Sequence, residues 1–147
     1  RSAPAPADLG GALRRVSGLA RRRGLVVVVS DFLGDESWQH PLRLLATRHE
    51  VLAVELIDPR ELELPDVGVL DLIDAETGER REIRTSARLR AQYAEAARQQ
   101  RDGIARAIRA AGTDHLILRT DRDWLLDLVR FVTLRRQRVE TLPRPLP

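Results

Sequence analysis

The chain has 147 residues, of which 43% are hydrophobic, and its 25 basic and 22 acidic side chains give a formal net charge of +3. This length and composition favour one soluble globular domain, and no apolar stretch is long enough to cross a bilayer. The chain contains no cysteine, which excludes a disulfide framework and a thiolate metal site, so we expect a cytoplasmic protein. It also contains no methionine and starts at Arg1, so we expect a piece of a longer protein.

Helical and strand-like patterns alternate along the chain. The helices show apolar residues at helical spacing after a polar cap, whereas the strands are short apolar runs. In chain order we expect a linker over 1–7, a helix over 8–22 capped by Asp8, a strand over 25–29, a helix over 38–48 capped by Ser37, a strand over 51–57, an antiparallel hairpin over 69–73 and 81–85, a helix over 86–111, a strand over 115–120, a helix from 124 to about 136, and a basic, proline-rich tail over 137–147.

This order of elements predicts an α/β fold with a mostly parallel sheet, helices on both faces and the hairpin at its edge. The strand over 25–29 is apolar on both faces, so we place it at the centre of the sheet. The remaining strands leave this central strand short of a neighbour. We therefore expect strands of the same sheet to precede Arg1, which would make the domain truncated at its N-terminus.

An acidic residue follows each of the three predicted parallel strands. Ser30 and Asp31 end the first strand, Asp58 follows the second, and Asp121 follows the third. Ligands of open α/β sheets bind at this carboxyl edge, so these side chains are candidates for a binding site. Helix capping and turn formation explain the same residues without a function, and we keep this structural alternative open.

The large and titratable side chains outside this edge favour structural roles. Trp38 and Trp124 lie on apolar helical stripes and are predicted to pack in the core, the latter together with Leu125, Val129 and Val132. The histidines show no metal-ligand spacing, and His115, at the start of a strand, is interpreted as structural.

Five segments in a fixed order resemble one known family. They are Val-Val-Val-Val-Ser-Asp-Phe-Leu at 26–33, Arg-His-Glu-Val-Leu-Ala-Val at 48–54, Asp-Pro-Arg-Glu at 58–61, Leu-Pro-Asp-Val-Gly at 64–68 and Thr-Asp-Arg-Asp-Trp-Leu at 120–125. From about residue 8 to residue 136 the chain resembles the C-terminal half of the bacterial domain-of-unknown-function family fifty-eight. The resemblance implies a von Willebrand factor A-like, Rossmann-type fold. It also implies a partnership with a MoxR-type AAA+ ATPase, in chaperone-like assembly or metal insertion.

The resemblance further implies a degenerate magnesium site. Von Willebrand A domains hold a divalent cation through an Asp-x-Ser-x-Ser loop, a threonine and an aspartate that follows a later strand. Ser30 and Asp31 match that last position, and Ala7-Asp8 stands where many relatives have Thr-Asp. The Asp-x-Ser-x-Ser loop is absent from this sequence. The ligands implied for Mg²⁺ are therefore Asp31, Ser30 and Asp8.

We expect a non-enzymatic protein-interaction module that binds its partner through Asp31, Asp35, Asp58 and Asp121. The sequence contains no cysteine nucleophile, no Gly-x-Ser-x-Gly elbow and no phosphate-binding glycine loop.

Other functions and assemblies stay open. If Asp31 and Asp58 approach one another, these strand-end carboxylates would suit a metal-dependent phosphoesterase. The arginine runs at 21–23 and 135–138 would suit a nucleic-acid-binding domain. A helix C-terminus or a solvated helix face also favours cations, and this structural interpretation is preferred over a nucleic-acid partner. A homodimer through the strand edge at Val26–Val29 is a further possibility.

Overall fold

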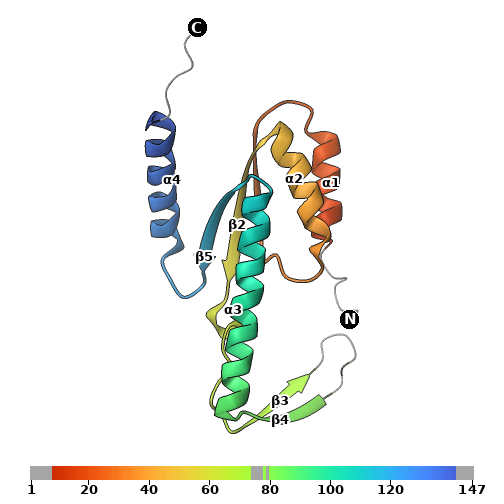
Figure 1. Cartoon of the computed structure of the whole chain (residues 1–147), viewed down its shortest axis with the longest axis vertical. Coiled ribbons are helices and arrows are strands. Elements are labelled where there is room, and N and C mark those ends of the chain that lie inside the picture. The colour runs from red at the N-terminus through yellow and green to blue at the C-terminus, as the bar shows by residue number, and fades with distance from the viewer. Residues whose placement is uncertain (1–7, 74–77, 79, 142–147) are drawn as a thin grey trace. The chain divides into compact units, whose positions relative to one another are not determined.

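The computed structural model describes residues 8–73, 78 and 80–141. The linker expected over 1–7, the turn of the hairpin at 74–77 and the end of the expected tail at 142–147 lie outside the described residues. The chain divides into two compact units (Figure 1). Unit 1 comprises residues 1–57 and 104–147, and unit 2 comprises residues 58–103.

Unit 1 contains the parallel sheet and the helices that cover it. Its elements alternate between helix and strand as the sequence predicts, which confirms the α/β fold class. They are α1 (Leu9–Leu19), β1 (Leu25–Ser30), the 3₁₀ turn η1 (Glu36–Trp38), α2 (Gln39–Arg48), β2 (Glu50–Ile57), the end of α3 (Ala87–Ala110), β5 (Asp114–Arg119) and α4 (Trp124–Thr141).

The three strands of unit 1 run parallel in the order β1-β2-β5. Among the described strands β2 lies between the other two, and β1 has one neighbour. β1 thus lacks a neighbour as expected, and its central place in a larger sheet stays a prediction. β2 is buried along most of its length, as a central strand requires. β1 leaves Leu25, Val27 and Val29 between 50% and 58% exposed. An apolar run thus predicts that both faces of a strand are apolar. It does not predict which of the two faces is covered by other elements.

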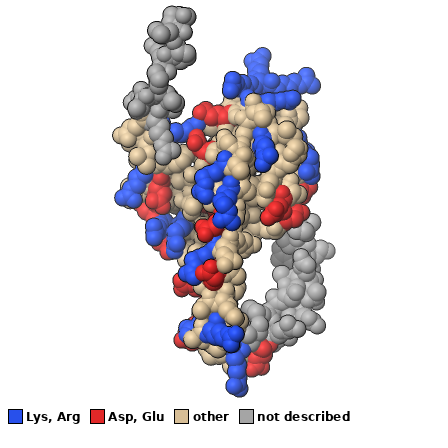
Figure 2. All heavy atoms as spheres, viewed as in Figure 1, with Lys and Arg blue, Asp and Glu red and all other residues tan. Residues whose placement is uncertain are grey.

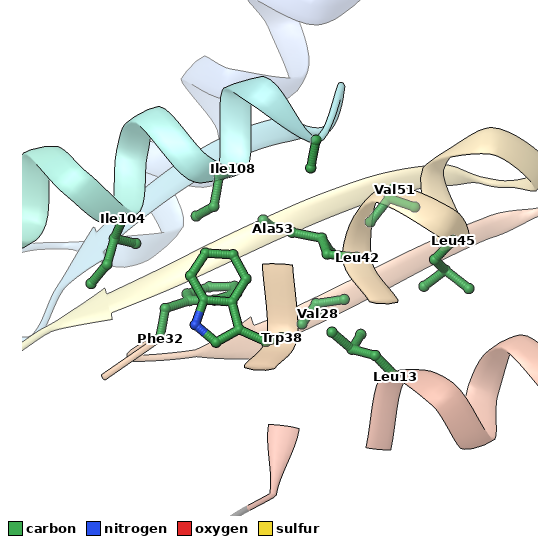
Figure 3. Close-up of a cluster of buried hydrophobic side chains, with 11 residues drawn as sticks. Leu13, Val28, Phe32, Trp38, Leu42, Leu45, Val51, Ala53, Ile104 and Ile108 are labelled. Carbon is green, nitrogen blue, oxygen red and sulfur yellow. The ribbon is translucent and has the colours of Figure 1, made fainter. Parts of the chain in front are cut away.

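One face of this sheet carries the main hydrophobic core (Figure 3). α1, α2 and the last turns of α3 pack on this face (Figure 1), and the indole of Trp38 stands edge-on to the ring of Phe32 with 5.0 Å between ring centroids. The prediction that Trp38 belongs to the core is confirmed. The side chains that form the core are Leu13, Val28, Phe32, Trp38, Leu42, Leu45, Val51, Ala53, Ile104, Ile108 and Ala111.

The other face of the sheet packs against α4. Leu128 and Phe131, one helical turn apart, contact the cluster formed by Leu52, Val54 and Leu116. Trp124 is 57% exposed, so the prediction that it packs in the core is wrong. The side chains expected to accompany it are also exposed, namely Leu125, Val129 and Val132.

Unit 2 holds the hairpin and most of α3. β3 (Val69–Ile73) and β4 (Arg80–Arg84) pair antiparallel as predicted, but they form a separate two-stranded sheet instead of the edge of the parallel sheet. Before the hairpin, the 3₁₀ turn η2 (Pro59–Glu61) contacts α3. The Tyr93 hydroxyl donates to the Glu61 carbonyl at 3.0 Å, and Arg101 contacts the Glu61 carboxylate at 3.2 Å.

Two helix ends differ from their predicted positions. α1 ends at Leu19, so the following arginines lie outside the helix. α4 continues to Thr141, so the first residues of the expected tail, 137–141, are helical. Among the residues described by the structure, we find no helix with the length and apolar character needed to span a membrane.

Candidate functional site

The carboxyl end of β1 turns sharply into a loop that we call the acidic loop, residues 30–37. The Ser30 hydroxyl accepts the Phe32 N–H at 3.0 Å, and the Asp31 carboxylate accepts the Leu33 N–H at 3.0 Å. Phe32 has a φ of 55°, a left-handed conformation that is uncommon for a large side chain. Phe32 is 2% exposed, and its ring anchors the loop in the core, whereas Asp31 is exposed.

The second half of the acidic loop is held by Asp35. Its carboxylate accepts the Ser37 N–H at 3.1 Å and the Ser37 hydroxyl at 2.5 Å. Both bonds lower the pKa of Asp35 below its ordinary value, and the bond from the Ser37 hydroxyl contributes the most. Asp35 therefore caps η1, and the prediction that Ser37 caps α2 is wrong, because Trp38 precedes α2 without a side-chain cap.

The start of α1 lies against the acidic loop. Asp8 caps α1 as predicted, and its carboxylate accepts the Gly11 N–H at 2.6 Å. A Cβ at Gly10 would stand 2.7 Å from the Ser37 hydroxyl oxygen, so this close approach requires glycine. The structure thus brings Asp8 to the same edge of unit 1 as Ser30, Asp31 and Asp35.

Asp121 lies at the same edge but beyond the central strand. The strands β1 and β5 flank β2, so about 10 Å separates their ends at the usual strand spacing. The Asp121 carboxylate accepts from Nε and Nη2 of Arg119 at 3.0 and 3.2 Å. This guanidinium lowers the pKa of Asp121.

Asp58 belongs to unit 2, where its carboxylate accepts the Arg60 N–H at 3.0 Å and caps η2. β1 and β2 are neighbours, as the approach of Asp31 to Asp58 would require, with Ser30 in register with Glu55. Each strand-end acid nevertheless stabilises a turn, a cap or a neighbouring arginine within its own segment.

The expected magnesium ligands do not form a complete ligand set. Asp8, Ser30 and Asp31 each accept a backbone N–H of their own turn. Within residues 8–73, 78 and 80–141, no three acidic, histidine or cysteine side chains gather as metal ligands would. Mg²⁺ takes six oxygen ligands, so the described residues alone do not fit this ion.

Glu55, which is in register with Ser30, belongs to a buried polar pair that the sequence did not indicate as a site. The His115 Nε2 and Glu55 Oε2 atoms are 2.8 Å apart, and the Glu55 side chain is 1% exposed. Glu55 interrupts the apolar run of β2, and this interruption is the sequence signal that could have found it. The interpretation of His115 as structural fits this contact.

The comparisons with known proteins identify the family but report no function. The family described as "Protein of unknown function DUF58" matches residues 1–103. No solved structure matches the chain significantly.

Three mycobacterial relatives illustrate the similarity. The chain is 52% identical over 130 residues to the uncharacterized protein MAV169 of Mycobacterium avium, covering 88% of this chain and 77% of that protein. It is 55% identical over 126 residues to the uncharacterized proteins Mb1516 of Mycobacterium bovis and Rv1480 of Mycobacterium tuberculosis, covering 86% of this chain. The matched part spans 39% of each of these two longer proteins. The resemblance noted in the sequence is thereby confirmed, and this chain belongs to the DUF58 family.

Proposed function

We propose that this chain is a non-enzymatic protein-interaction module whose acidic loop binds a AAA+ ATPase of the MoxR type. The pair would act in chaperone-like assembly or metal insertion. The family resemblance supports the choice of partner, and it also supports the von Willebrand A-like assignment that belongs to this proposal.

The observation that carries the proposal is the construction of the acidic loop. Phe32 and Trp38 fix the loop from inside the core, while Asp31 and Asp35 stand on its exposed side. Strained backbone conformations such as that of Phe32 cluster at functional sites. A rigid loop loses little conformational entropy on binding, so it presents its acids to a partner at low cost.

The charge of the loop defines the partner surface. Asp31, Asp35 and Glu36 place acidic side chains within six consecutive residues, and all three are exposed. Such a patch is complementary to a basic surface, and the interaction should weaken as salt screens it. The proposal therefore requires a basic surface on the ATPase.

The test uses the purified ATPase from the same genome and binding measured by biolayer interferometry. The double variant Asp31→Asn, Asp35→Asn removes both charges but keeps oxygens that can accept the backbone N–H groups of the loop. We expect its affinity to fall at least about tenfold, or about 1.4 kcal/mol. The control is Asp102→Asn, which removes an exposed acid on α3.

The outcomes separate the parts of the proposal. Unchanged affinity of the double variant would assign the interface to another surface, and absence of binding by the wild-type chain would remove the ATPase as partner. Repeating the measurement without nucleotide, in Mg²⁺ and in EDTA, tests the magnesium dependence that the family resemblance implies.

A further inference from the structure

A second candidate site lies at the opposite edge of the sheet from the acidic loop. α1 and α2 both end there, because each is followed by a parallel strand. Their ends enclose an open hollow of about 590 Å³, which we call the arginine hollow. Arg21 and Arg23 line it from the segment after α1, and Arg48 and His49 line it from the end of α2. Figure 2 shows basic side chains gathered over this end of unit 1.

The arginine hollow carries uncompensated positive charge. Among the ion pairs formed by the described residues, none involves Arg21, Arg23 or Arg48. The two helix C-termini contribute about half a negative charge each, which three guanidinium groups exceed. The negative partial charges of the two helix ends therefore do not account for all three arginines.

Acidic side chains near the hollow are engaged elsewhere. Glu50 and Asp114 line an adjoining hollow, and both form ion pairs with Arg135 of α4. Val51 packs in the core beneath α1 and α2, so the preceding residue, Glu50, points to the opposite face of the sheet. Arg23 borders both hollows, but these two acids pair with Arg135 on the side of α4, and neither lines the arginine hollow.

His49 supplies an independent sign of a ligand. The residue is 6% exposed, and its buried Nε2 atom has no hydrogen-bond partner among the residues that the structure describes. The same residue lines both the arginine hollow and the adjoining one. A buried polar atom without a partner is unfavourable in a folded protein. A turn of the imidazole towards the hollow would expose this atom and let a ligand oxygen satisfy it.

We propose that the arginine hollow binds the phosphate group of a small molecule. The guanidinium groups of Arg21, Arg23 and Arg48 would donate to the phosphate oxygens, for which their planar, forked geometry is well suited. Once its ring has turned towards the hollow, the Nε2–H tautomer of His49 would donate one further bond. This site is separate from the acidic loop and does not depend on the proposed ATPase partner.

The test is isothermal titration calorimetry of this chain with orthophosphate, pyrophosphate and ADP. We expect saturable binding of one equivalent, weakened at least about tenfold by Arg48→Gln and by His49→Gln. The control is Arg43→Gln, which removes an exposed arginine of α2 that does not line the arginine hollow. If ADP binds more tightly than pyrophosphate, the ligand of the hollow is a nucleotide. If pyrophosphate binds more tightly, the ligand is an inorganic phosphate.

Three results would overturn the proposal. The first is that none of the three probes binds saturably. The second is an equal loss of affinity in Arg43→Gln and Arg48→Gln. The third is an unchanged affinity of a folded His49→Gln variant. Thermal melting of each variant establishes that it is folded. If His49→Gln does not fold, the comparison of Arg48→Gln with Arg43→Gln decides the proposal, because both substitutions change surface side chains.

Discussion

Glu55 of β2 and His115 of β5 meet through a 2.8 Å contact between Oε2 and Nε2, on the face of the sheet that also carries the main core. The register pairs His115 with Ala53, so the two side chains are diagonal neighbours on that face. The Glu55 side chain is almost entirely buried and the His115 side chain nearly so. The contact therefore joins the central strand to an edge strand through a polar pair inside an apolar layer.

Removing the imidazole should destabilise unit 1. His115→Ala withdraws a hydrogen-bond partner from a buried carboxylate, and we expect a loss of about 1–3 kcal/mol in the free energy of unfolding. His115→Gln keeps an N–H donor and should lose less. Urea denaturation measures both, with the exposed His40→Ala as control, which should change stability by less than about 0.5 kcal/mol. Equal stability of His115→Ala and the wild type would show that the contact adds nothing.

Secondary structure was largely predictable from the sequence because local periodicity determines it. The strand run Leu25–Ser30 and the helix Ala87–Ala110 were found within a residue or two of their predicted bounds. The order of the strands was not predictable in the same way. Among the described strands β2 lies between β1 and β5, and this order depends on long-range pairing that no local pattern records.

The acids at the candidate site were predictable, whereas their partners were not. Asp31, Asp35 and Asp121 lie at the carboxyl edge of the sheet as the alternation of helix and strand implies. The pairing of Glu55 with His115 joins residues 60 positions apart, so it depends on the register of two strands. The exposure of Trp124 depends on which face of α4 meets the sheet, and Leu128 and Phe131 determine that face.

Gly10 and Gly18 of α1 should respond oppositely to substitution by alanine. A Cβ at Gly10 would lie 2.7 and 2.9 Å from the hydroxyl and carbonyl oxygens of Ser37, whereas one at Gly18 would meet no atom of the described residues within 4 Å. We expect Gly10→Ala to lower the free energy of unfolding by about 1–3 kcal/mol through overpacking. Gly18→Ala should raise it by up to about 1 kcal/mol through helix propensity. Thermal melting compares the two, and stabilisation by both would contradict the close packing of α1 on η1.

The titration of Asp35 should depend on Ser37. The hydrogen bond from the Ser37 hydroxyl lowers the pKa of Asp35 in the folded chain. It therefore stabilises the folded chain at pH values above the ordinary pKa of aspartate. This stabilisation is lost as the pH falls through the lowered pKa of Asp35. Ser37→Ala should raise the pKa of Asp35 towards its ordinary value. Carboxyl chemical shifts in an NMR titration measure this. Asp121, whose pKa Arg119 lowers, is the internal control and should not move.

The outer edge of β1 should promote self-association of this chain. Within the described residues β1 pairs with β2 alone, and Val27 and Val29 are at least half exposed beside the unpaired edge. Edge strands with exposed apolar side chains readily pair with another chain, which favours the dimer expected through Val26–Val29. We expect Val27→Lys to raise the dimer dissociation constant at least about tenfold, and size-exclusion chromatography with light scattering measures it. Leu19→Lys is the matched control, because this more exposed leucine lies outside the strand. A monomer at every concentration, or an equal effect of both substitutions, would exclude pairing through β1.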